Sequence, residues 1–115
     1  MQELPILQKT YDFIKWYIPI LGRLPKDHKF NLGNRIAERL FEFLEILIDV
    51  QFQKQKLPQL EQLNRSLAVL RYQNRLLFDL QLMDTQRYEY IIQHLDDIGT
   101  NLGGWIKQQR SKVTV

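Results

Sequence analysis

The sequence lacks cysteine altogether and contains only four prolines, five glycines and two histidines among its 115 residues. Without cysteine the chain can form neither a disulfide framework nor a thiolate metal site, so a reducing cytoplasm is the expected compartment. No stretch approaches the roughly 18 consecutive apolar residues of a transmembrane helix, and residues 1–9 contain no basic segment followed by an apolar core. We therefore expect neither a membrane span nor a signal peptide.

Residue types that carry catalysis are also scarce. The two histidines, His28 and His94, do not stand in a metal-binding spacing such as H-E-x-x-H. The two serines, Ser66 and Ser111, have no nucleophile-elbow motif around them. The carboxylates of residues 38–49 lack the Glu-x-x-His motifs of a di-metal bundle. We expect no enzymatic activity, no metal and no other cofactor.

Apolar residues make up 44% of the chain and charged residues 25%, which is typical of a single globular domain over residues 1–115. The apolar spacing is helical, and strand-like alternation is absent. Four helices are predicted, over residues 5–22, 31–53, 57–82 and 85–110, followed by a basic tail at 111–115. The expected fold is an all-α, up-down four-helix bundle.

Three of the predicted helices show an apolar seam with steps of three and four residues. In chain order the seams are Leu7, Tyr11, Ile14, Ile18 and Leu21; Leu60, Leu63, Leu67, Leu70, Asn74 and Leu77; and Tyr88, Ile92, Leu95, Gly99, Leu102 and Ile106. Asn74 takes a seam position, where a buried amide tends to fix the register of packed helices. Pro19 lies inside the first helix and predicts a kink or an irregular end there.

The helix predicted over residues 31–53 is apolar on more than one face. Its polar residues lie mainly on one narrow line: Glu38, Glu42, Glu45 and Asp49. The outer helix of a monomeric bundle needs an apolar stripe only about 100° wide. The helix is therefore either deeply buried in its own bundle or covered by a second copy of the chain. We favour a homo-oligomer, with Phe41, Leu44 and Ile48 as candidate interface residues.

Three glycines lie in the last predicted helix, in the stretch IGTNLGGWI at residues 98–106. Each costs a helix interior roughly 1 kcal/mol relative to alanine. Gly103 and Gly104 could end the helix as a C-cap, or Gly99 and Gly103 could open a furrow for close packing. Because the apolar period continues beyond them, we favour the furrow and assign Gly99, Gly103 and Trp105 to close packing or an oligomer interface.

A net charge of +3 and a pI near 9.3 permit an anionic partner without requiring one. Arg65 has Glu61 four residues before it, the favoured orientation for an ion pair on one helix. Arg71 has no acidic residue three or four positions away and shares a face with Arg75. These two arginines could bind an anionic partner, or they could pair with the acidic line of the second helix.

The chain from Ile98 onward contains Lys107, Arg110 and Lys112 and no acidic residue. These cations could interact with the C-terminal helix dipole, or they could extend a surface that contacts phosphates. From the residues alone, a nucleic-acid role and a purely structural role both remain open.

Three segments together resemble one protein family. They are IPILGRLPKDH at residues 18–28, LAVLRYQNRL at 67–76 and GTNLGGWI at 99–106. They match the patterns P-I-x(3)-[IL]-P-[KR]-x-H, L-R-x(3)-R and G-x(2)-L-G-x-W-I, none of which is specific alone. In their order and spacing the chain resembles the Avd-like four-helix proteins, the accessory variability determinants of diversity-generating retroelements.

This resemblance implies a five-fold barrel of four-helix protomers that binds the element's reverse transcriptase. It also implies a basic surface that binds RNA or DNA during mutagenic copying of a template repeat. At matching positions that surface falls on Arg71 and Arg75, and we extend it to Lys107 and Arg110. A ring would multiply the modest net charge about fivefold. Neither the nucleic-acid segment nor the surface that meets the polymerase follows from the sequence.

More distantly, the chain resembles the four-helix proteins encoded in intervening sequences of ribosomal RNA genes. The N-I-A-E-G run expected of that group appears here only as RIAER at residues 35–39. The alternative function is therefore an oligomeric structural or interaction bundle without a nucleic-acid role. A reverse transcriptase gene and a template/variable repeat pair beside this gene would distinguish the two.

Overall fold

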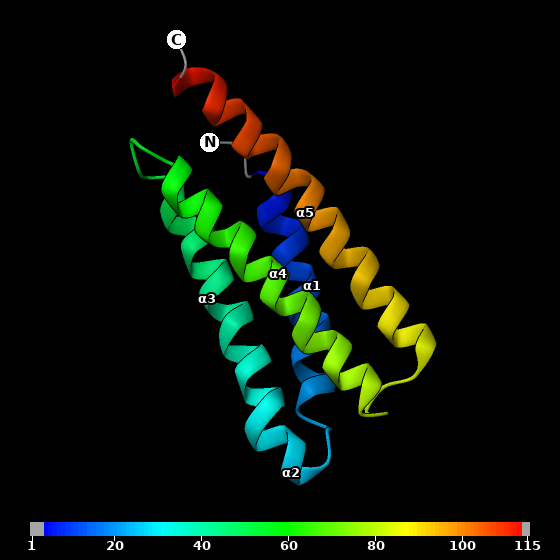
Figure 1. Ribbon diagram of the computed structural model, residues 1–115. Helices are drawn as coiled ribbons and strands as arrows, with labels where there is room; N and C mark the ends of the chain where they lie inside the picture. Colours follow the sequence, from blue (N-terminus) through cyan, green and yellow to red (C-terminus); the bar gives the residue numbers. More distant parts are fainter. Residues whose placement is uncertain (1–3, 114–115) are drawn as a thin grey trace.

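The computed structural model describes residues 4–113, which form a bundle of four long antiparallel helices (Figure 1). These helices are α1 (Pro5–Leu21), α3 (Asn34–Val50), α4 (Leu57–Asp79) and α5 (Thr85–Val113). Between α1 and α3, one helical turn, α2 (Lys26–His28), continues directly into a π-helix, η1 (Lys29–Gly33). No strand occurs in this part of the chain. The predicted all-α four-helix bundle is confirmed for the protomer.

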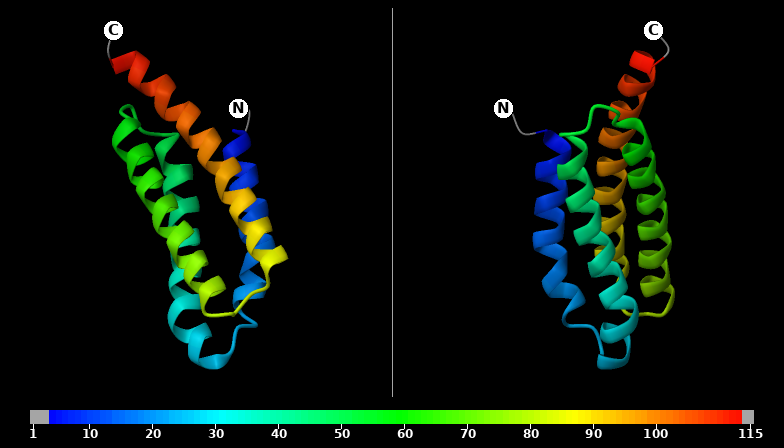
Figure 2. Two further views of the ribbon diagram at one scale, coloured as in Figure 1. Left: turned by 45° about the vertical axis from the view of Figure 1, so that its right-hand side comes forward. Right: turned by 90° about the vertical axis from the view of Figure 1, so that its left-hand side faces the viewer.

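The four long helices form a closed ring of neighbours (Figure 2). α3 and α5 each pack beside both α1 and α4, so α1 and α4 lie at opposite corners of the bundle. The molecule is elongated, with extents of 51 × 22 × 21 Å. No helix among residues 4–113 is both long enough and apolar enough to span a membrane.

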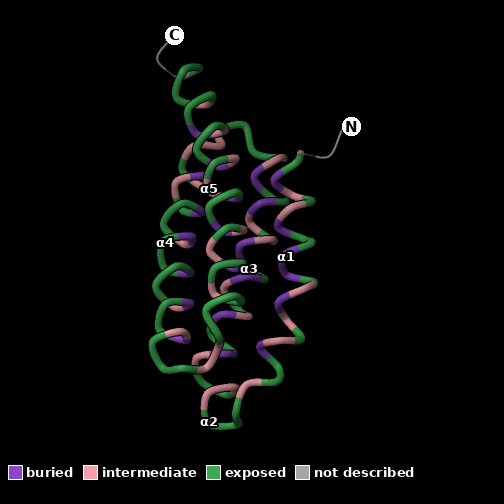
Figure 3. The backbone as a smooth tube through the Cα atoms, turned by 90° about the vertical axis from the view of Figure 1, so that its right-hand side faces the viewer, coloured by how far each residue is buried: buried purple, intermediate pink, exposed green. Residues whose placement is uncertain are grey.

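The core runs along the inward side of every long helix (Figure 3). In α4 its buried residues are Leu60, Leu63, Leu67, Leu70, Asn74 and Leu77. This set is the predicted seam without exception. Leucines at these steps lie on one stripe of the helix, and burying that stripe stabilises the bundle by about 25 cal/mol per Å² of apolar surface.

The seams predicted for α1 and α5 were partly wrong, because each was rotated away from the true core side. The buried residues of α1 are Ile6, Thr10, Phe13, Ile14, Tyr17 and Leu21. Tyr11, a predicted seam residue, is 53% exposed. The buried residues of α5 are Ile91, Leu95, Ile98, Leu102 and Ile106, whereas the predicted seam residues Tyr88, Ile92 and Gly99 are only partly buried.

Several element ends differ from the sequence expectation. The predicted helix over 31–53 begins as the π-helix and ends at Val50. α4 ends at Asp79 rather than at residue 82. α5 continues through Val113, so residues 111–113 are helical rather than a tail, and residues 114–115 lie outside the described part of the chain. α1 ends at Leu21, shortly after Pro19, whose ring removes one backbone donor.

Side-chain hydrogen bonds satisfy backbone groups where α3 ends and where α5 begins. The Lys56 ammonium group donates hydrogen bonds to the carbonyl oxygens of Val50, Gln51 and Gln53 at 3.2, 3.1 and 2.6 Å. It thus supplies donors to the C-terminal end of α3, where carbonyl groups have no helical partner. At the start of α5, Asp84 accepts a hydrogen bond from the backbone N–H of Arg87 at 2.7 Å. Asp84 is therefore the N-cap of that helix.

Candidate nucleic-acid interface

The middle of α4 is a positively charged segment on the surface of the bundle. It contains Arg65, Arg71 and Arg75, and no acidic residue from Gln62 to Phe78. The buried stripe of α4 consists of residues that recur every three or four positions. The three arginines lie outside this stripe, and all are exposed. Guanidinium groups at such positions match the geometry of phosphate oxygens.

Arg71 extends from α4 across to α5. Its Nη2 atom lies 3.3 Å from Oδ1 of Asp96, and its side chain is 44% exposed. A Cβ at Gly99 would lie only 2.8 Å from that same Nη2 atom and 3.1 Å from Cδ2 of Leu67. Gly99 therefore leaves room for Arg71 to reach Asp96. The motifs at residues 67–76 and 99–106 thus meet in space.

The partner of Arg71 was not predicted from the sequence. The alternative considered there was an ion pair with the acidic line on α3, whereas the structure pairs Arg71 with Asp96 of α5. Asp96 is one turn before Gly99 on α5, and only the packing of α5 beside α4 brings it to Arg71. In the sequence, Gly99 indicated that another group packs closely against this helix, but it did not show that the group is Arg71.

Arg75 and Arg65 differ in their neighbours. Arg75 Nε lies 3.7 Å from Oδ2 of Asp79, in a pair whose side chains are 63% and 59% exposed. Glu61 pairs with Arg110 rather than with Arg65, at 3.2 Å. The predicted Arg65–Glu61 pair is therefore wrong, and no ion pair of Arg65 is found among residues 4–113.

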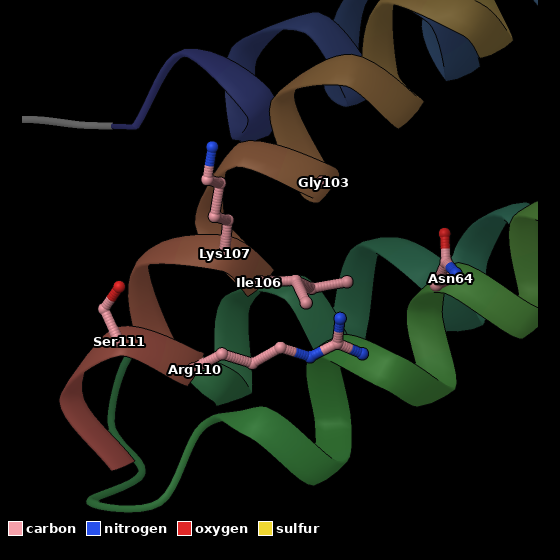
Figure 4. A pocket seen from close by; sticks show the side chains of 6 residues that line it. All are labelled: Asn64, Gly103, Ile106, Lys107, Arg110 and Ser111. Carbon is pink, nitrogen blue, oxygen red and sulfur yellow. The ribbon is translucent and has the colours of Figure 1, made fainter. Parts of the chain in front are cut away.

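The two C-terminal cations lie between α4 and α5, near the C-terminal end of α5. Lys107 and Arg110 line a shallow pocket of about 530 Å³ between α4 and α5 together with Asn64, Gly103, Ile106 and Ser111 (Figure 4). Figure 4 shows Arg110 extending toward α4 and Lys107 pointing in another direction. Asn64 stands about 10 Å from Arg71 along the axis of α4, at 1.5 Å per residue. The candidate cations therefore form two separate groups: Arg71 and Arg75 in the middle of α4, and Lys107 and Arg110 near the C-terminal end of α5.

The acidic neighbours of these arginines do not prevent anion binding. Ion pairs between exposed side chains contribute about 0–1 kcal/mol and are screened by salt. A phosphate group can replace the carboxylate of Asp96 or Asp79, since a charge-assisted bond to a guanidinium is available to either anion. The arrangement is suited to binding a polyanion.

The candidate interface residues on α3 form an apolar surface in the protomer. Phe41 and Ile48 are 45% and 44% exposed. Leu44 is partly buried and packs against the core. Phe52, beyond the end of α3, continues the exposed apolar line. This surface is what the sequence pattern predicted, and its coverage by another copy of the chain stays a prediction.

The glycine furrow is formed only at its first position. Gly99 is in close contact with α4 side chains, but among residues 4–113 nothing lies within 4 Å of where a Cβ would stand at Gly103 or Gly104. The helix continues through both residues, so the C-cap interpretation is wrong. Trp105 is partly buried and packs against the core. Gly103 therefore has no close packing against the described residues, and its place in an oligomer interface stays a prediction.

Of the two histidines, His94 lies among aromatic rings and His28 is partly buried. The ring of His94 lies 5.4 Å from that of Phe13 and 4.4 Å from that of Tyr90, centroid to centroid. Among residues 4–113 no three histidine or carboxylate side chains are grouped as ligands of a metal ion.

One surface residue that the sequence pattern did not indicate is Tyr72, which is 71% exposed beside the α4 arginines.

Comparison with known proteins assigns the family. A family model described as bAvd-like matches residues 4–109, a span that includes all three motif segments. A search of the curated proteins finds no match. The resemblance to the Avd-like four-helix proteins is confirmed by this match. The chain belongs to the bAvd-like family.

Proposed function

We propose that this protein is an accessory factor of a diversity-generating retroelement. It binds the element's reverse transcriptase together with RNA or DNA and supports mutagenic copying of the template repeat. Membership of the bAvd-like family supports an accessory role of the Avd type. The association with a retroelement and the binding of its polymerase and of nucleic acid are what we propose beyond family membership.

The observation that carries the proposal is the placement of the L-R-x(3)-R motif. Arg71 and Arg75 both lie on the exposed side of α4, in a segment without acidic residues from Gln62 to Phe78. Phosphate contacts of this kind supply affinity without sequence preference.

We further propose that five copies assemble into a ring through the apolar surface of α3. Phe41 and Ile48 are the exposed anchors of this surface. A five-fold ring is held by head-to-tail contacts, so the α3 surface of each copy would pack against a different surface of the next copy. Such a ring multiplies the positive charge about fivefold and repeats the α4 segment around one assembly.

The test is the double variant Arg71→Ala/Arg75→Ala, in the full chain and with the reverse transcriptase present or absent. Binding of labelled RNA and DNA oligonucleotides should weaken for all sequences, with the melting temperature nearly unchanged because both side chains are exposed. The slope of log affinity against log salt should flatten by about one unit per lost phosphate contact.

The matched control removes two exposed cations from the opposite corner of the bundle, as Lys15→Ala/Arg23→Ala. Arg65→Ala is not suitable as a control, because Arg65 lies on α4 and its predicted partner Glu61 pairs elsewhere. An equal loss in the control would show that only total charge matters and would contradict the proposed site.

The second candidate function is an oligomeric structural bundle with no nucleic-acid role. One observation favours it: Arg71, Arg75 and Arg110 each lie beside a carboxylate. In that case these arginines serve helix packing and surface solubility. Failure of the wild-type protein to bind RNA or DNA, with and without the reverse transcriptase, would support this candidate.

A further inference from the structure

The outward side of α4 combines apolar, aromatic and cationic residues on one surface. Val69, Tyr72 and Leu76 are all exposed, and Tyr72 is 71% exposed. They line a shallow groove of about 340 Å³ together with Ala68 and Gln73. No group in that lining carries a charge. A largely uncovered tyrosine at the centre of an apolar groove is not explained by the core of the bundle.

The spacing along α4 places these residues in one line. Val69, Tyr72 and Leu76 follow each other at steps of three and four, so their side chains are neighbours on the helix surface. Helical side chains lean toward the N-terminus of their helix, which for Tyr72 is the side of Ala68 and Val69. Because those two side chains are small, a face of the tyrosine ring stays accessible to a flat ligand.

Two arginines flank this groove: Arg65 lies before it along α4, and Arg75 lies beside its C-terminal part. Arg75 is three residues after Tyr72, and Arg65 is two turns before it on the same side of the helix. The two arginines are about 15 Å apart along the axis at 1.5 Å per residue. The helix between them has no acidic residue. No ion pair holds Arg65 within residues 4–113.

We propose that this face of α4 binds single-stranded nucleic acid. A base stacks on Tyr72, and its neighbour lies in the apolar groove. Arg65 and Arg75 contact phosphates on either side. An aromatic ring within a basic surface is the arrangement by which proteins hold unpaired strands, since every base has a stacking face and the backbone is anionic. The inference rests on the proposed nucleic-acid role and adds the strandedness of the ligand and the residue that recognises it.

A second copy of the chain is the rival occupant of this face. The apolar part of the α4 groove involves few residues, whereas a stable protein interface buries about 800 Å² on each partner. Arginines also flank the groove, whereas the α3 surface of Phe41 and Ile48 has the exposed Glu45 between them and no cation. Charge therefore assigns the α4 face to a polyanion and leaves the α3 face for self-association.

The experiment compares three variants of the full chain. Tyr72→Leu keeps an apolar side chain and removes the stacking ring, whereas Tyr72→Trp keeps a ring. The control is Tyr11→Leu, which changes another exposed tyrosine, on α1. The probes are a fluorescein-labelled oligothymidylate of about 20 nucleotides and a labelled DNA duplex of the same length. Light scattering and thermal melting are recorded for each variant.

Tyr72→Leu should weaken binding of the single strand about tenfold or more, as expected for loss of one base–aromatic stack. Duplex binding should change less than about twofold, because paired bases offer no free stacking face. Tyr72→Trp and Tyr11→Leu should bind the single strand as the wild type does. Melting temperatures should stay close to that of the wild type.

The possible failures are distinguishable. If Tyr72→Leu binds the single strand as tightly as the wild type, the stacking role is overturned while the proposed function stands. A fall in assembly mass for Tyr72→Leu would show that the face is a contact between subunits, which also overturns the inference. If the wild type binds neither probe, with or without reverse transcriptase, the proposed function fails together with it.

Discussion

At the scale of single residues, one buried polar pair links opposite corners of the bundle. Tyr17 of α1 and Asn74 of α4 are both fully buried. The Tyr17 hydroxyl donates a hydrogen bond to Oδ1 of Asn74, and the Asn74 amide donates to the carbonyl oxygen of Leu70 at 2.8 Å. Because a buried polar group without a partner costs about 1–3 kcal/mol, this pair favours one register of α1 against α4.

The same pair predicts a loss of stability at alkaline pH. Burial raises the pKa of Tyr17 well above its ordinary value of 10.0, and the charge of Arg87 lowers it only in part. The unfolded chain therefore loses the Tyr17 proton near pH 10, while the folded chain still holds it. The free energy of unfolding should fall as the pH rises above 10, by up to about 1.4 kcal/mol per pH unit from this group.

Urea unfolding between pH 8 and pH 11 tests this, with the wild type compared against Tyr17→Phe. The phenylalanine variant should be about 1–2 kcal/mol less stable at pH 8, because Asn74 loses its donor. Its stability should then decline less steeply above pH 10. Tyr11→Phe, at an exposed position, should follow the wild type throughout. Parallel pH profiles for wild type and Tyr17→Phe would contradict the prediction.

The glycines of α5 predict opposite effects for one substitution. Gly99→Leu should lower the free energy of unfolding by about 1–3 kcal/mol, since Arg71 and Leu67 already occupy the space beside it. Gly103→Leu should raise it by up to about 1 kcal/mol, because that position is open and leucine is the better helix former. Thermal melting checks both. A higher melting temperature for Gly99→Leu would show that the contact with α4 is loose.

At the scale of elements, the end of α4 contains a strained turn. Gln81 has φ 61°, which non-glycine residues seldom adopt. The backbone N–H of Leu82 donates to the carbonyl oxygen of Leu77 and that of Gln81 to Phe78, both at 2.9 Å. These are the two hydrogen bonds of a Schellman motif, in which glycine is the preferred residue.

Gln81→Gly should therefore stabilise the protein by about 1 kcal/mol, because it relieves the left-handed conformation. Gln55→Gly, in the exposed α3–α4 connection, is the matched control and should stabilise nothing. There the added glycine only increases the entropy of the unfolded chain. Equal melting temperatures for Gln81→Gly and Gln55→Gly would refute the role assigned to the turn.

The accuracy of the predicted seams also differed between elements, for a physical reason. In α4 the apolar residues of the predicted stripe all face the core, so the period identified the buried side. α5 has apolar side chains on a second line, which packs at an edge between helices. Tyr88 stacks on Phe78 of α4, with ring centroids 4.5 Å apart. Periodicity locates both lines and does not distinguish the central one from the peripheral one.

At the scale of the whole molecule, we expect several copies of the chain to assemble. The exposed apolar line of α3 predicts self-association, and the family resemblance makes that a pentamer. Light scattering at micromolar concentration should give about five times the 13.9 kDa of one chain.

Phe41→Lys/Ile48→Lys should dissociate the assembly without unfolding the protomer, because both side chains are exposed in it. Leu76→Lys on α4 is the matched control. A wild-type mass of 13.9 kDa would contradict the prediction.

The sequence by itself determined the fold class, the helical segments, the α4 seam and the family motifs. These follow from local regularities: helical periods, scarce glycine and proline, and short patterns at set spacings. It also located the exposed arginines of the L-R-x(3)-R motif, since their exposure depends only on the period of one helix.

Only the tertiary structure decided which groups meet across helices. Asp96 faces Arg71, Glu61 faces Arg110 rather than Arg65, and Gly99 rather than Gly103 receives a neighbouring side chain. Each of these contacts depends on the rotation and axial offset of α5 against α4. Those two quantities are fixed by the packing of the core as a whole, because every buried side chain must fit at once. No pattern within a single helix contains that information.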